Sequence, residues 1–443
     1  MDKKRIDVIS LGCSKNLVDS ERLLKQLELS GFQAFHNSDN VEGDIVVINT
    51  CGFIGDAKEE SINTILTYAE AKNEGRIKEL YVMGCLSERY RDDLLAEIPE
   101  IDRIYGKFDW VNIVSDIIKR NPATMPYDRV ITTPSHYTYL KIAEGCNRFC
   151  AFCAIPLITG RYKSRPIEEI LEEVRMLVGK GVKEFNVIAQ DLSSYGLDIY
   201  KRLALPELID RMAEIDGVKW IRLHYAYPSE FPYEILDVMA RHSNVCNYLD
   251  IALQHINNDV LKNMRRHITK EETLALIRTI REKVPGIHIR TTLMVGFPGE
   301  TEDAFNELKE FVREAKFERM GAFAYCEEDD TYAAKNFSDS IPQEVKESRL
   351  EEIMTIQEDV ALESNQSKIG KTMTVVIDRE EPDYFVGRTE FDSPEVDPEV
   401  LIDKDDRLTV GNFYDVEITE ALPFELMAKL KDSSDGDIAE SHK

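Results

Sequence analysis

Short apolar runs rich in Val and Ile alternate with amphipathic stretches over the first part of the chain. The strand candidates are residues 5–11, 43–49 and 79–83. Residues 19–30 and 57–73 lie between them and have the length and apolar spacing of helices. Parallel strands need a crossover connection, so this alternation is typical of a parallel sheet with helices on both faces. We therefore predict a doubly wound α/β domain over residues 1–125.

A second alternation of strands and helices follows a linker at residues 126–136, which contains two prolines. The strand candidates are residues 137–143, 184–189, 220–225, 248–253, 288–295 and 321–325. Six strands with intervening helices predict a partial, TIM-like (β/α)6 barrel, whose active site would lie at the carboxyl ends of the strands. A long connecting helix with Pro342 in its first turn follows, so we expect this domain to cover residues 132–368.

After Gly370 the apolar residues alternate with polar ones over short segments. The strand candidates are residues 373–377, 384–388, 399–402, 413–419 and 426–430. Five short strands predict a small antiparallel β-barrel of OB-like character over residues 369–434. The polar residues 435–443 are expected to form a frayed tail.

Composition narrows the class of protein. Hydrophobic residues make up 43% of the 443 residues and charged residues 31%, which is normal for a globular chain of two or three domains. The first residues lack the features of a signal peptide, and no apolar run is long enough to span a bilayer. Eight cysteines without a secretory signal predict reduced thiols in the cytoplasm. The formal net charge of −27 favours a basic partner over a phosphate backbone, with simple solubility as the alternative reason.

The strongest chemical signal is the C-x3-C-x2-C run formed by Cys146, Cys150 and Cys153, directly after a predicted strand and Gly145. Soft thiolate ligands favour iron–sulfur clusters, zinc or copper(I). A four-iron cluster takes four ligands, so three cysteines leave one iron open to a non-protein ligand, and an open metal position usually indicates catalysis. The alternative is a zinc knuckle completed by a distant Cys or His.

Three further cysteines, Cys13, Cys51 and Cys85, each follow one of the N-terminal strand candidates by one or two residues. Ligands of an open parallel sheet bind outside the carboxyl ends of its strands. This topology can bring the three sulfur atoms to one edge of the sheet, which predicts a second three-thiolate site. The alternative is three unrelated cysteines that fill the core.

These features resemble the radical S-adenosylmethionine (SAM) enzymes and, across essentially the whole chain, their methylthiotransferases. The matching segments are LGCSKNLVDSE at 11–21, INTCGFI at 48–54, MGCL at 83–86, EGCNRFCAFCAIP at 144–156, GRYKSRP at 160–166 and RTTLMVGFPGET at 290–301. The resemblance implies an N-terminal methylthiotransferase domain, a radical-SAM domain and a C-terminal TRAM domain.

The resemblance also implies replacement of a C–H bond by C–S–CH₃, with two 4Fe-4S clusters and two SAM molecules per product. Cys146, Cys150 and Cys153 would hold the catalytic cluster, which generates the radical. Cys13, Cys51 and Cys85 would hold the second cluster, where a sulfur atom is methylated before the substrate radical takes it; an electron relay is the alternative role. A reducing electron-donor protein and a sulfur source are implied partners.

Two branches of the family differ in substrate. MiaB-like members modify a tRNA adenosine, whereas RimO-like members modify the β-carbon of an aspartate in ribosomal protein S-twelve. LGCSKNLVDSE, with Ser14 in place of the usual proline, and VGRTEFDSPEVD in the terminal barrel resemble the RimO branch. Residues 371–431 contain seven Lys or Arg and sixteen Asp or Glu, which suits a basic ribosomal protein, free or in the ribosome, and disfavours direct nucleic-acid binding. A ribosome-binding sensor without turnover is the alternative from another class.

Individual residues complete the prediction. The candidate SAM-binding residues at or near the strand ends are Gln190, Gln254, Arg290, Gly296 and Glu300. Cys246 and Cys326 match no ligand spacing and are expected to be packing residues. Four acidic residues of the terminal barrel are expected to help dock a basic loop of the substrate, namely Asp392, Glu395, Asp397 and Glu399.

Overall fold

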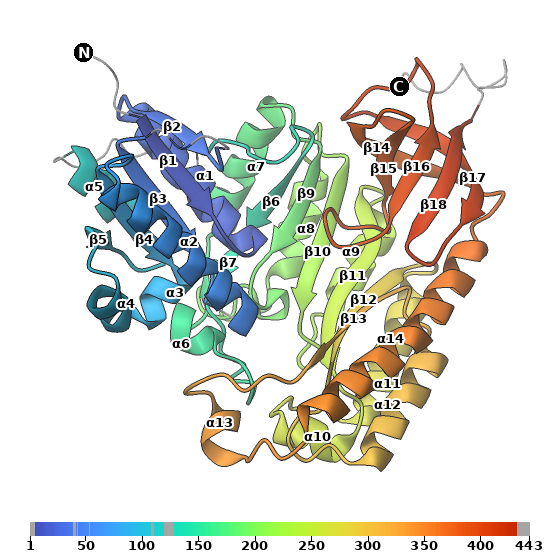
Figure 1. Ribbon diagram of the computed structural model, residues 1–443. Coiled ribbons are helices and arrows are strands. Elements are labelled where there is room, and N and C mark those ends of the chain that lie inside the picture. The colour runs from blue at the N-terminus through green and yellow to red at the C-terminus, as the bar shows by residue number, and fades with distance from the viewer. Residues whose placement is uncertain are drawn as a thin grey trace.

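The computed structural model describes residues 5–38, 41, 43–52, 54–107, 110–118 and 128–431. Figure 1 shows three parts: an N-terminal α/β unit, a central sheet flanked by helices, and a small C-terminal barrel at the end of the long helix α14 (Gln343–Gln366). The predicted tail, residues 435–443, and the start of the predicted linker lie outside the described residues. In the part of the chain that the structure describes, no helix is both long and apolar enough to cross a membrane.

The N-terminal unit is built on a parallel sheet with the strand order β2-β1-β3-β4-β5. The strands are β1 (Arg5–Ser10), β2 (Gln33–His36), β3 (Ile45–Thr50), β4 (Glu79–Gly84) and β5 (Arg103–Ile104). The helices are α1 (Ser14–Leu29), α2 (Gly55–Asn73), α3 (Cys85–Arg89), α4 (Arg91–Glu97) and α5 (Trp110–Ile118). Separate hydrophobic clusters cover the two faces of the sheet, so the doubly wound α/β prediction is confirmed. The short strands β2 and β5 were not predicted.

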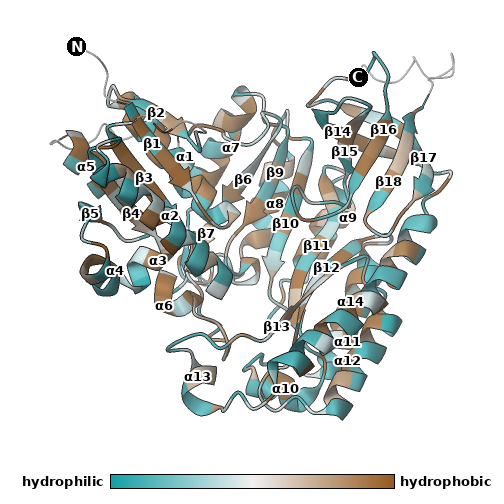
Figure 2. Ribbon diagram, viewed as in Figure 1, coloured by the Kyte–Doolittle hydropathy of each residue, from teal (hydrophilic) through white to brown (hydrophobic). Residues whose placement is uncertain are grey.

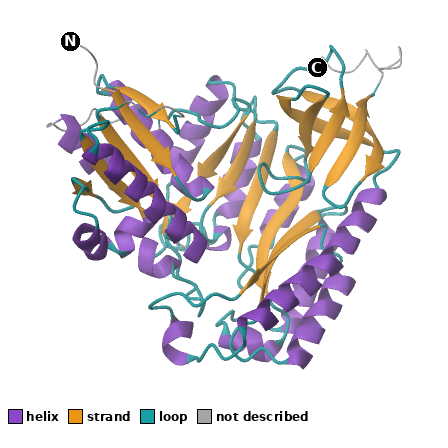
Figure 3. Ribbon diagram, viewed as in Figure 1, coloured by secondary structure: helices purple, strands orange, loops and turns teal. Residues whose placement is uncertain are grey.

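The central sheet has the strand order β13-β12-β11-β10-β9-β6, and every neighbouring pair is parallel. The strands are β6 (Tyr137–Lys141), β9 (Glu184–Ile188), β10 (Trp220–Ala226), β11 (Val245–Gln254), β12 (His288–Val295) and β13 (Arg319–Ala324). Figure 3 shows its helices on the outside of the sheet, and Figure 2 shows hydrophobic residues on the strands and hydrophilic ones on the outer helix faces. The prediction of six strands in a partial (β/α) barrel is confirmed.

Helices connect the central strands on the outer face. The longer ones are α7 (Ile167–Gly179), α8 (Leu205–Ala213), α9 (Glu234–Arg241), α11 (Lys270–Lys283) and α12 (Glu302–Ala315). Shorter elements are α6 (Ile155–Thr159), α10 (Asn258–Asn263), α13 (Tyr332–Asn336), the 3-10 turn Leu192–Ser194 and the antiparallel pair β7 (Ala143–Glu144) and β8 (Lys163–Ser164). Helix α14 packs against α12 and β13 and leads into the terminal barrel.

The C-terminal unit is a closed barrel with the strand order β14-β15-β16-β18-β17. Its strands are β14 (Thr372–Glu380), β15 (Tyr384–Thr389), β16 (Glu399–Asp403), β17 (Phe413–Ala421) and β18 (Glu425–Leu430). The OB-like prediction holds, with one correction: β16 and β18 pair in parallel, whereas the other pairs are antiparallel. Strand β17 lies between them in sequence, so β16 and β18 run in the same direction when the barrel closes.

The loop after β15 fastens the barrel to the central sheet. The carboxylate of Asp392 is buried and accepts a hydrogen bond from Arg319 Nε at 3.0 Å. Asp397 accepts hydrogen bonds from the Tyr248 hydroxyl at 2.7 Å and from Arg290 Nε at 3.2 Å. The Tyr139 hydroxyl donates to Glu395 at 3.2 Å.

These contacts overturn the docking expectation for two of the four acidic residues, Asp392 and Asp397. The side chains of Asp392 and Asp397 are 1% and 2% exposed, so they cannot meet a protein from solution. Glu395 is exposed although it accepts a hydrogen bond from Tyr139, and Glu399 forms a surface pair with Arg379 at 2.6 Å, so for these two residues docking stays a prediction. A cluster of acidic residues in a sequence suggests a charged surface. Here Asp392 and Asp397 instead pair with Arg319 of β13 and Arg290 of β12, which are far away in the sequence.

A second set of buried ion pairs joins the N-terminal unit to the central sheet. Arg129 is fully buried and pairs with Glu21 of α1 and, at 3.0 Å, with Glu173 of α7. Its guanidinium also donates to the carbonyl oxygen of Tyr139 on β6. Burial alone raises the pKa of Glu173, but Arg165, Arg22 and Arg129 lower it to about 2. The carboxylate is therefore charged at neutral pH and holds three guanidinium groups together.

We predict that Asp392→Asn destabilises the attachment of the barrel by about 3–5 kcal/mol, because it leaves Arg319 charged and buried without its counter-ion. The Trp220 ring lies 4.8 Å from that of Phe413, so tryptophan fluorescence during denaturant unfolding reports on this interface. The matched control is Asp405→Asn, whose partner Arg407 lies within an exposed turn and should matter little.

The same variant has a testable pH dependence. Burial raises the pKa of Asp392, but Arg319 and Lys368 outweigh it and hold the pKa at about 2. The side chain of Asp in an unfolded chain has a pKa of about 3.9. The advantage of the native protein over Asp392→Asn is thus present above pH 4 and should shrink as the pH falls toward 2. An advantage that is constant over this window would show that Asp392 does not act as a charge.

Candidate active site

The first cysteine group lies on the loop that follows β7. Cys146 and Cys150 are buried and Cys153 is partly exposed. The Cys153 amide donates to the Cys150 carbonyl oxygen at 3.0 Å, which curls the loop around the sulfur atoms. Gly145 has φ +76°, and a Cβ there would lie 2.2 Å from the backbone oxygen of Arg161. Only glycine allows this approach, so the cysteine loop is held against the segment after α6.

A guanidinium group and a hydroxyl group from other loops contact the sulfur atom of Cys150. Arg266 Nη1 lies 3.3 Å from Cys150 Sγ, and the Tyr227 hydroxyl lies 3.7 Å from it. The Arg266 guanidinium also stacks on the Tyr227 ring at 4.0 Å. Burial raises the pKa of Cys146 to about 12 and that of Cys153 further, and neighbouring thiols add to this effect. Such thiols lose their protons when they bind a metal, and positive donors stabilise the resulting sulfur charge.

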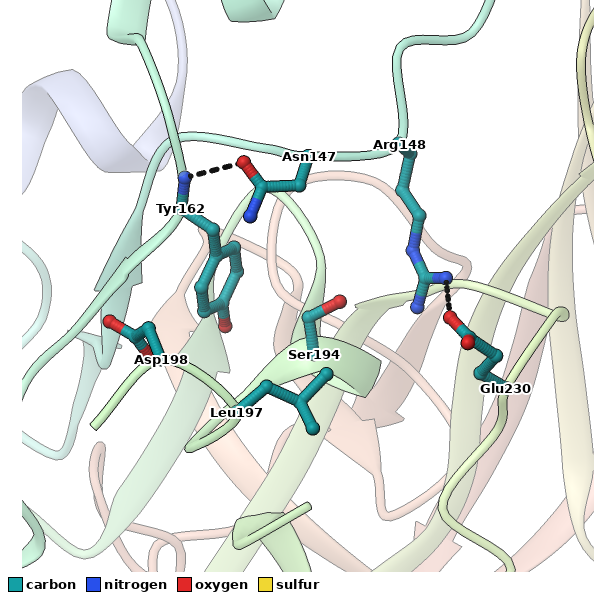
Figure 4. A pocket seen from close by; sticks show the side chains of 7 residues that line it. All are labelled: Asn147, Arg148, Tyr162, Ser194, Leu197, Asp198 and Glu230. Atoms are coloured by element: carbon teal, nitrogen blue, oxygen red, sulfur yellow. Dashed lines mark hydrogen bonds and ion pairs between the residues drawn. The ribbon is translucent and has the colours of Figure 1, made fainter. Parts of the chain in front are cut away.

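Figure 4 shows how the residues between the first two cysteines are held beside a pocket of about 270 Å³. Arg148 pairs with Asp191 at 2.7 Å and with Glu230 at 2.7 Å. Asn147 Oδ1 accepts a hydrogen bond from the Tyr162 amide at 3.2 Å. The cysteine loop is therefore tied to the carboxyl ends of β9 and β10, where a (β/α) barrel places its active site.

The second cysteine group forms at the carboxyl edge of the N-terminal sheet. Strands β1, β3 and β4 are neighbours, and Thr50 at the end of β3 is level with Gly84 at the end of β4. Cys51 and Cys85 come directly after these strands, and Cys13 caps the first turn of α1. Gly12 has φ +85°, and a Cβ on it would lie 2.7 Å from Cys51 Cβ. Glycine therefore lets the loop of Cys13 close over Cys51.

Asn16 ties the loops of this second group together. Its side-chain amide donates to the carbonyl oxygens of Leu11 at 3.1 Å and Thr50 at 3.0 Å. The thiol of Cys85 donates to Asn16 Oδ1 at 3.7 Å. The prediction that parallel topology gathers Cys13, Cys51 and Cys85 at one edge agrees with this arrangement.

The two cysteine groups share a wall. Cys85 packs with Ala154 and Ile158, which follow the first cysteine group on α6. Helix α3, which begins at Cys85, lies against α6. Both sets of sulfur atoms therefore border the same region between the N-terminal unit and the central sheet.

A buried polar cluster lines this region. Lys141 of β6 pairs with Asp19 of α1 and with Glu144. Lys107 pairs with the same Glu144 at 3.4 Å, and Gln190 donates to it at 3.0 Å. Burial raises the pKa of Glu144, but Lys141 and Lys107 lower it to about 2, so the carboxylate stays charged. Sequence reasoning named none of Asp19, Lys107 and Lys141 as a site residue: Asp19 lies in the matching segment 11–21, but Lys107 and Lys141 belong to no motif.

The candidate SAM-binding residues occupy different surroundings. Gln190 contacts the polar cluster, and Gln254 is buried at the end of β11 with φ +72°. Gly296 donates its amide to Glu300 at 3.0 Å, and Glu300 also pairs with Arg349 at 2.6 Å.

Arg290 lies near the amino end of β12, where it pairs with Asp397 at 3.2 Å and with Asp250 at 3.6 Å. Gln190 thus contacts Glu144, two residues before Cys146, whereas Glu300 and Arg290 have carboxylate or guanidinium partners of their own. Of the remaining cysteines, Cys246 is a packing residue as expected, whereas Cys326 is exposed, which corrects that expectation.

The donor sets suit clusters better than single ions. Among the described residues, no three His, Cys, Asp or Glu side chains converge on a point where one metal ion would sit. An iron–sulfur cluster places one thiolate on each iron, so its ligands surround a body of several atoms and need not converge. Two groups of three thiols, each on loops that only glycine can close, fit that requirement.

An open parallel sheet with a C-x3-C-x2-C loop at its carboxyl edge defines the radical SAM class, and residues 140–312 match the family model of the Radical SAM superfamily. Residues 5–106 match the model of the uncharacterized protein family UPF0004, and residues 369–430 match that of the TRAM domain. Among solved structures, the radical SAM methyltransferase TsrM from Kitasatospora setae has a TM-score of 0.56 at 16% identity, over 72% of this chain and 73% of that one. At this identity the likeness shows the fold alone.

Relatives at high identity narrow the class to one family. The ribosomal protein uS12 methylthiotransferase RimO of Bacteroides thetaiotaomicron is 61% identical over 97% of this chain and 99% of its own length. The proteins of that name from Porphyromonas gingivalis strain ATCC 33277 and Christiangramia forsetii are 57% and 52% identical, over 98% and 96% of this chain and 100% and 94% of their own lengths. The chain belongs to the RimO family of radical SAM proteins.

Cys13 and Cys326 are the two exposed thiols, and we predict that Cys13 is the more reactive of them when the protein is free of iron. Enclosure raises the pKa of Cys13, but Lys15, the Asn16 amide and Lys107 together lower it below the ordinary value. For Cys326, burial and Glu328 raise the pKa. At neutral pH Cys13 should thus be alkylated several-fold faster, and the difference should shrink as the pH rises past both pKa values. Peptide mass spectrometry after timed iodoacetamide treatment measures both rates; faster reaction of Cys326 would contradict the electrostatic argument.

Proposed function

We propose that this protein transfers a methylthio group to the β-carbon of an aspartate in ribosomal protein uS12. The observation that carries the proposal is the shared wall, formed by Cys85, Ala154 and Ile158, between two groups of three cysteines. Sulfur insertion needs one centre that activates a carbon and another that delivers sulfur, and the two must be close. The curated relatives carry the name of the uS12 enzyme, which supports this substrate and not the tRNA alternative.

In this proposal each cysteine group holds a 4Fe-4S cluster, and SAM binds at the group formed by Cys146, Cys150 and Cys153. When bound, these cofactors supply one-electron cleavage of SAM, hydrogen abstraction from an unactivated carbon, and a sulfur atom that can be methylated. The chain supplies the surroundings: Arg266 donates to Cys150, the Tyr227 hydroxyl lies beside the same sulfur atom, and Gln190 and Gln254 are the candidate SAM contacts. Glu300 acts on the same site indirectly, because it holds Gly296 and Arg349 in place.

The domain boundaries belong to the proposal. Residues 1–125 form the methylthiotransferase domain with the second cluster, residues 132–368 the radical-SAM domain and residues 369–434 the TRAM domain. A reducing electron-donor protein and a sulfur source are further partners that the chemistry requires. A ribosomal substrate, free or in the assembling ribosome, and reduced cysteines favour the cytoplasm as the place of action.

Mass spectrometry of uS12 tests the proposed function. In a deletion strain, uS12 should lose the mass increment of one methylthio group on its aspartate, and the plasmid-borne gene should restore it. Total tRNA from the same strain should keep all its methylthio nucleosides. Loss on tRNA with unchanged uS12 would establish the other substrate class, and loss on neither would favour a protein without turnover.

Cysteine variants test the assignment of the two clusters. Anaerobically reconstituted protein should contain about eight irons. Changing Cys146, Cys150 and Cys153 together to Ala should remove half the iron and all reductive cleavage of SAM.

The matched variant changes Cys13, Cys51 and Cys85 to Ala. It should also lose half the iron, yet it should still cleave SAM, because the radical-generating group keeps its ligands. Full methylthiolation by this second variant would show that the N-terminal cysteines are structural.

A further inference from the structure

One lysine at the border of the second cysteine group lacks an ionic partner. Lys15 lies in the first turn of α1, two residues after Cys13. Its Nζ atom lies 3.6 Å from the centre of the Tyr225 ring on β10. Within the described part of the chain, no carboxylate lies in ion-pair distance of Lys15, although many other lysines of this acidic protein have such a partner.

The backbone holds Tyr225 in an unusual conformation. Tyr225 has φ +64°, and the pairing of β10 with β11 is irregular between Leu223 and Ala226. Positive φ strains the backbone of a bulky residue, and such residues gather at binding sites. The Tyr225 ring stands at this irregular end of β10, and Lys15 lies over it from α1. The ammonium group is therefore held between the N-terminal unit and the central sheet.

The charges around Lys15 leave its ammonium group available to a ligand. Asp250 of β11 and Asp397 of the loop after β15 both pair with Arg290, at 3.6 Å and 3.2 Å. Lys15 acts on Asp250 through space, and on Cys13 both through space and through a backbone hydrogen bond. An exposed cation gains less from an aromatic ring than from a charged hydrogen bond, so an incoming carboxylate can bind the Lys15 ammonium group in place of the ring.

We propose that Lys15, supported by Tyr225, binds the side-chain carboxylate of the substrate aspartate. The inference rests on the proposed function and names the residue that selects its substrate. In aspartate the carboxylate carbon is bonded directly to the β-carbon. An ammonium group that holds the carboxylate therefore fixes the reacting carbon to within one bond, beside Cys13 and the sulfur that its group would carry. The ring keeps the lysine in place before binding, which lowers the entropy cost of the contact.

The carboxylate could come from two sources, because SAM also carries one. The proposal commits to the aspartate, since Lys15 borders the N-terminal cysteine group and not the loop of Cys146, Cys150 and Cys153. The test therefore measures SAM and the protein substrate separately.

The experiment uses the full-length, cluster-loaded protein without reductant, so that binding is measured without turnover. The ligands are labelled uS12 and uS12 with the target Asp changed to Asn, and fluorescence anisotropy gives both dissociation constants. The variants are Lys15→Met, which keeps the length of the side chain, and Lys15→Arg, which keeps its charge. Lys25→Met on the same helix is the matched control, because its partners are Glu28 and Asp128 on the outer side. Iron content and reductive SAM cleavage verify that each variant is folded.

Native protein and Lys25→Met should bind uS12 roughly tenfold or more tightly than the Asn form. Lys15→Met should bind both forms equally and weakly, Lys15→Arg should keep part of the preference, and the dissociation constant of SAM should not change. General attraction to the acidic chain predicts the opposite order, since the Asn form is more basic.

Three results would overturn the inference: an unchanged preference in Lys15→Met, no preference in the native protein, or weaker SAM binding with an unchanged preference. The proposed function fails separately, if native protein leaves uS12 unmodified under reducing conditions.

Discussion

The structure depends on a rigid join between the N-terminal unit and the central sheet. Two groups of thiols on different units can serve one reaction only if the units cannot slide past each other. Arg129, fully buried between Glu21 and Glu173, provides that constraint, because displacing it would separate two buried charges, those of Arg129 and Glu21, from each other. Ion pairs of this kind add little net stability compared with apolar packing, but they accept only one geometry. A shared wall between Cys85 and α6 requires such fixed geometry.

Sequence reasoning succeeded where a local pattern is tied to topology. Val- and Ile-rich runs between helical stretches dictate a parallel sheet, and a parallel sheet brings successive strand ends to one edge. Cys13, Cys51 and Cys85 are 38 and 34 residues apart, so spacing alone would never group them. We grouped them because each one follows a predicted strand. The three cysteines of the C-x3-C-x2-C loop could be grouped without any knowledge of the topology, since they are close in sequence.

The pattern could not show which charged residues face one another across domains. Asp392 and Arg319 are 73 residues apart, and both have the letters of a solvated surface. The sequence does not show that Asp392 and Asp397 meet cations of the central sheet, so the prediction that these two residues dock a partner was wrong. Glu300 shows the same problem at shorter range: its loop follows a strand end, as a ligand-binding residue would. Its carboxylate instead contacts the Gly296 amide and the Arg349 guanidinium, and so shapes the loop itself.

The distribution of charge reconciles an acidic protein with an acidic target side chain. The net charge of −27 acts over long distances and attracts a basic ribosomal protein to the whole molecule. Around the cysteines the acidic excess is offset, since the buried Lys107 and Lys141 pair with Glu144 and Asp19, and Arg266 adds a further buried cation beside Cys150. The long-range field of exposed charges is unselective and is weakened by salt, whereas buried cations act at contact distance and are screened much less. Recruitment can therefore use the basic surface of the substrate, and selection of one acidic residue can take place only where the cations converge.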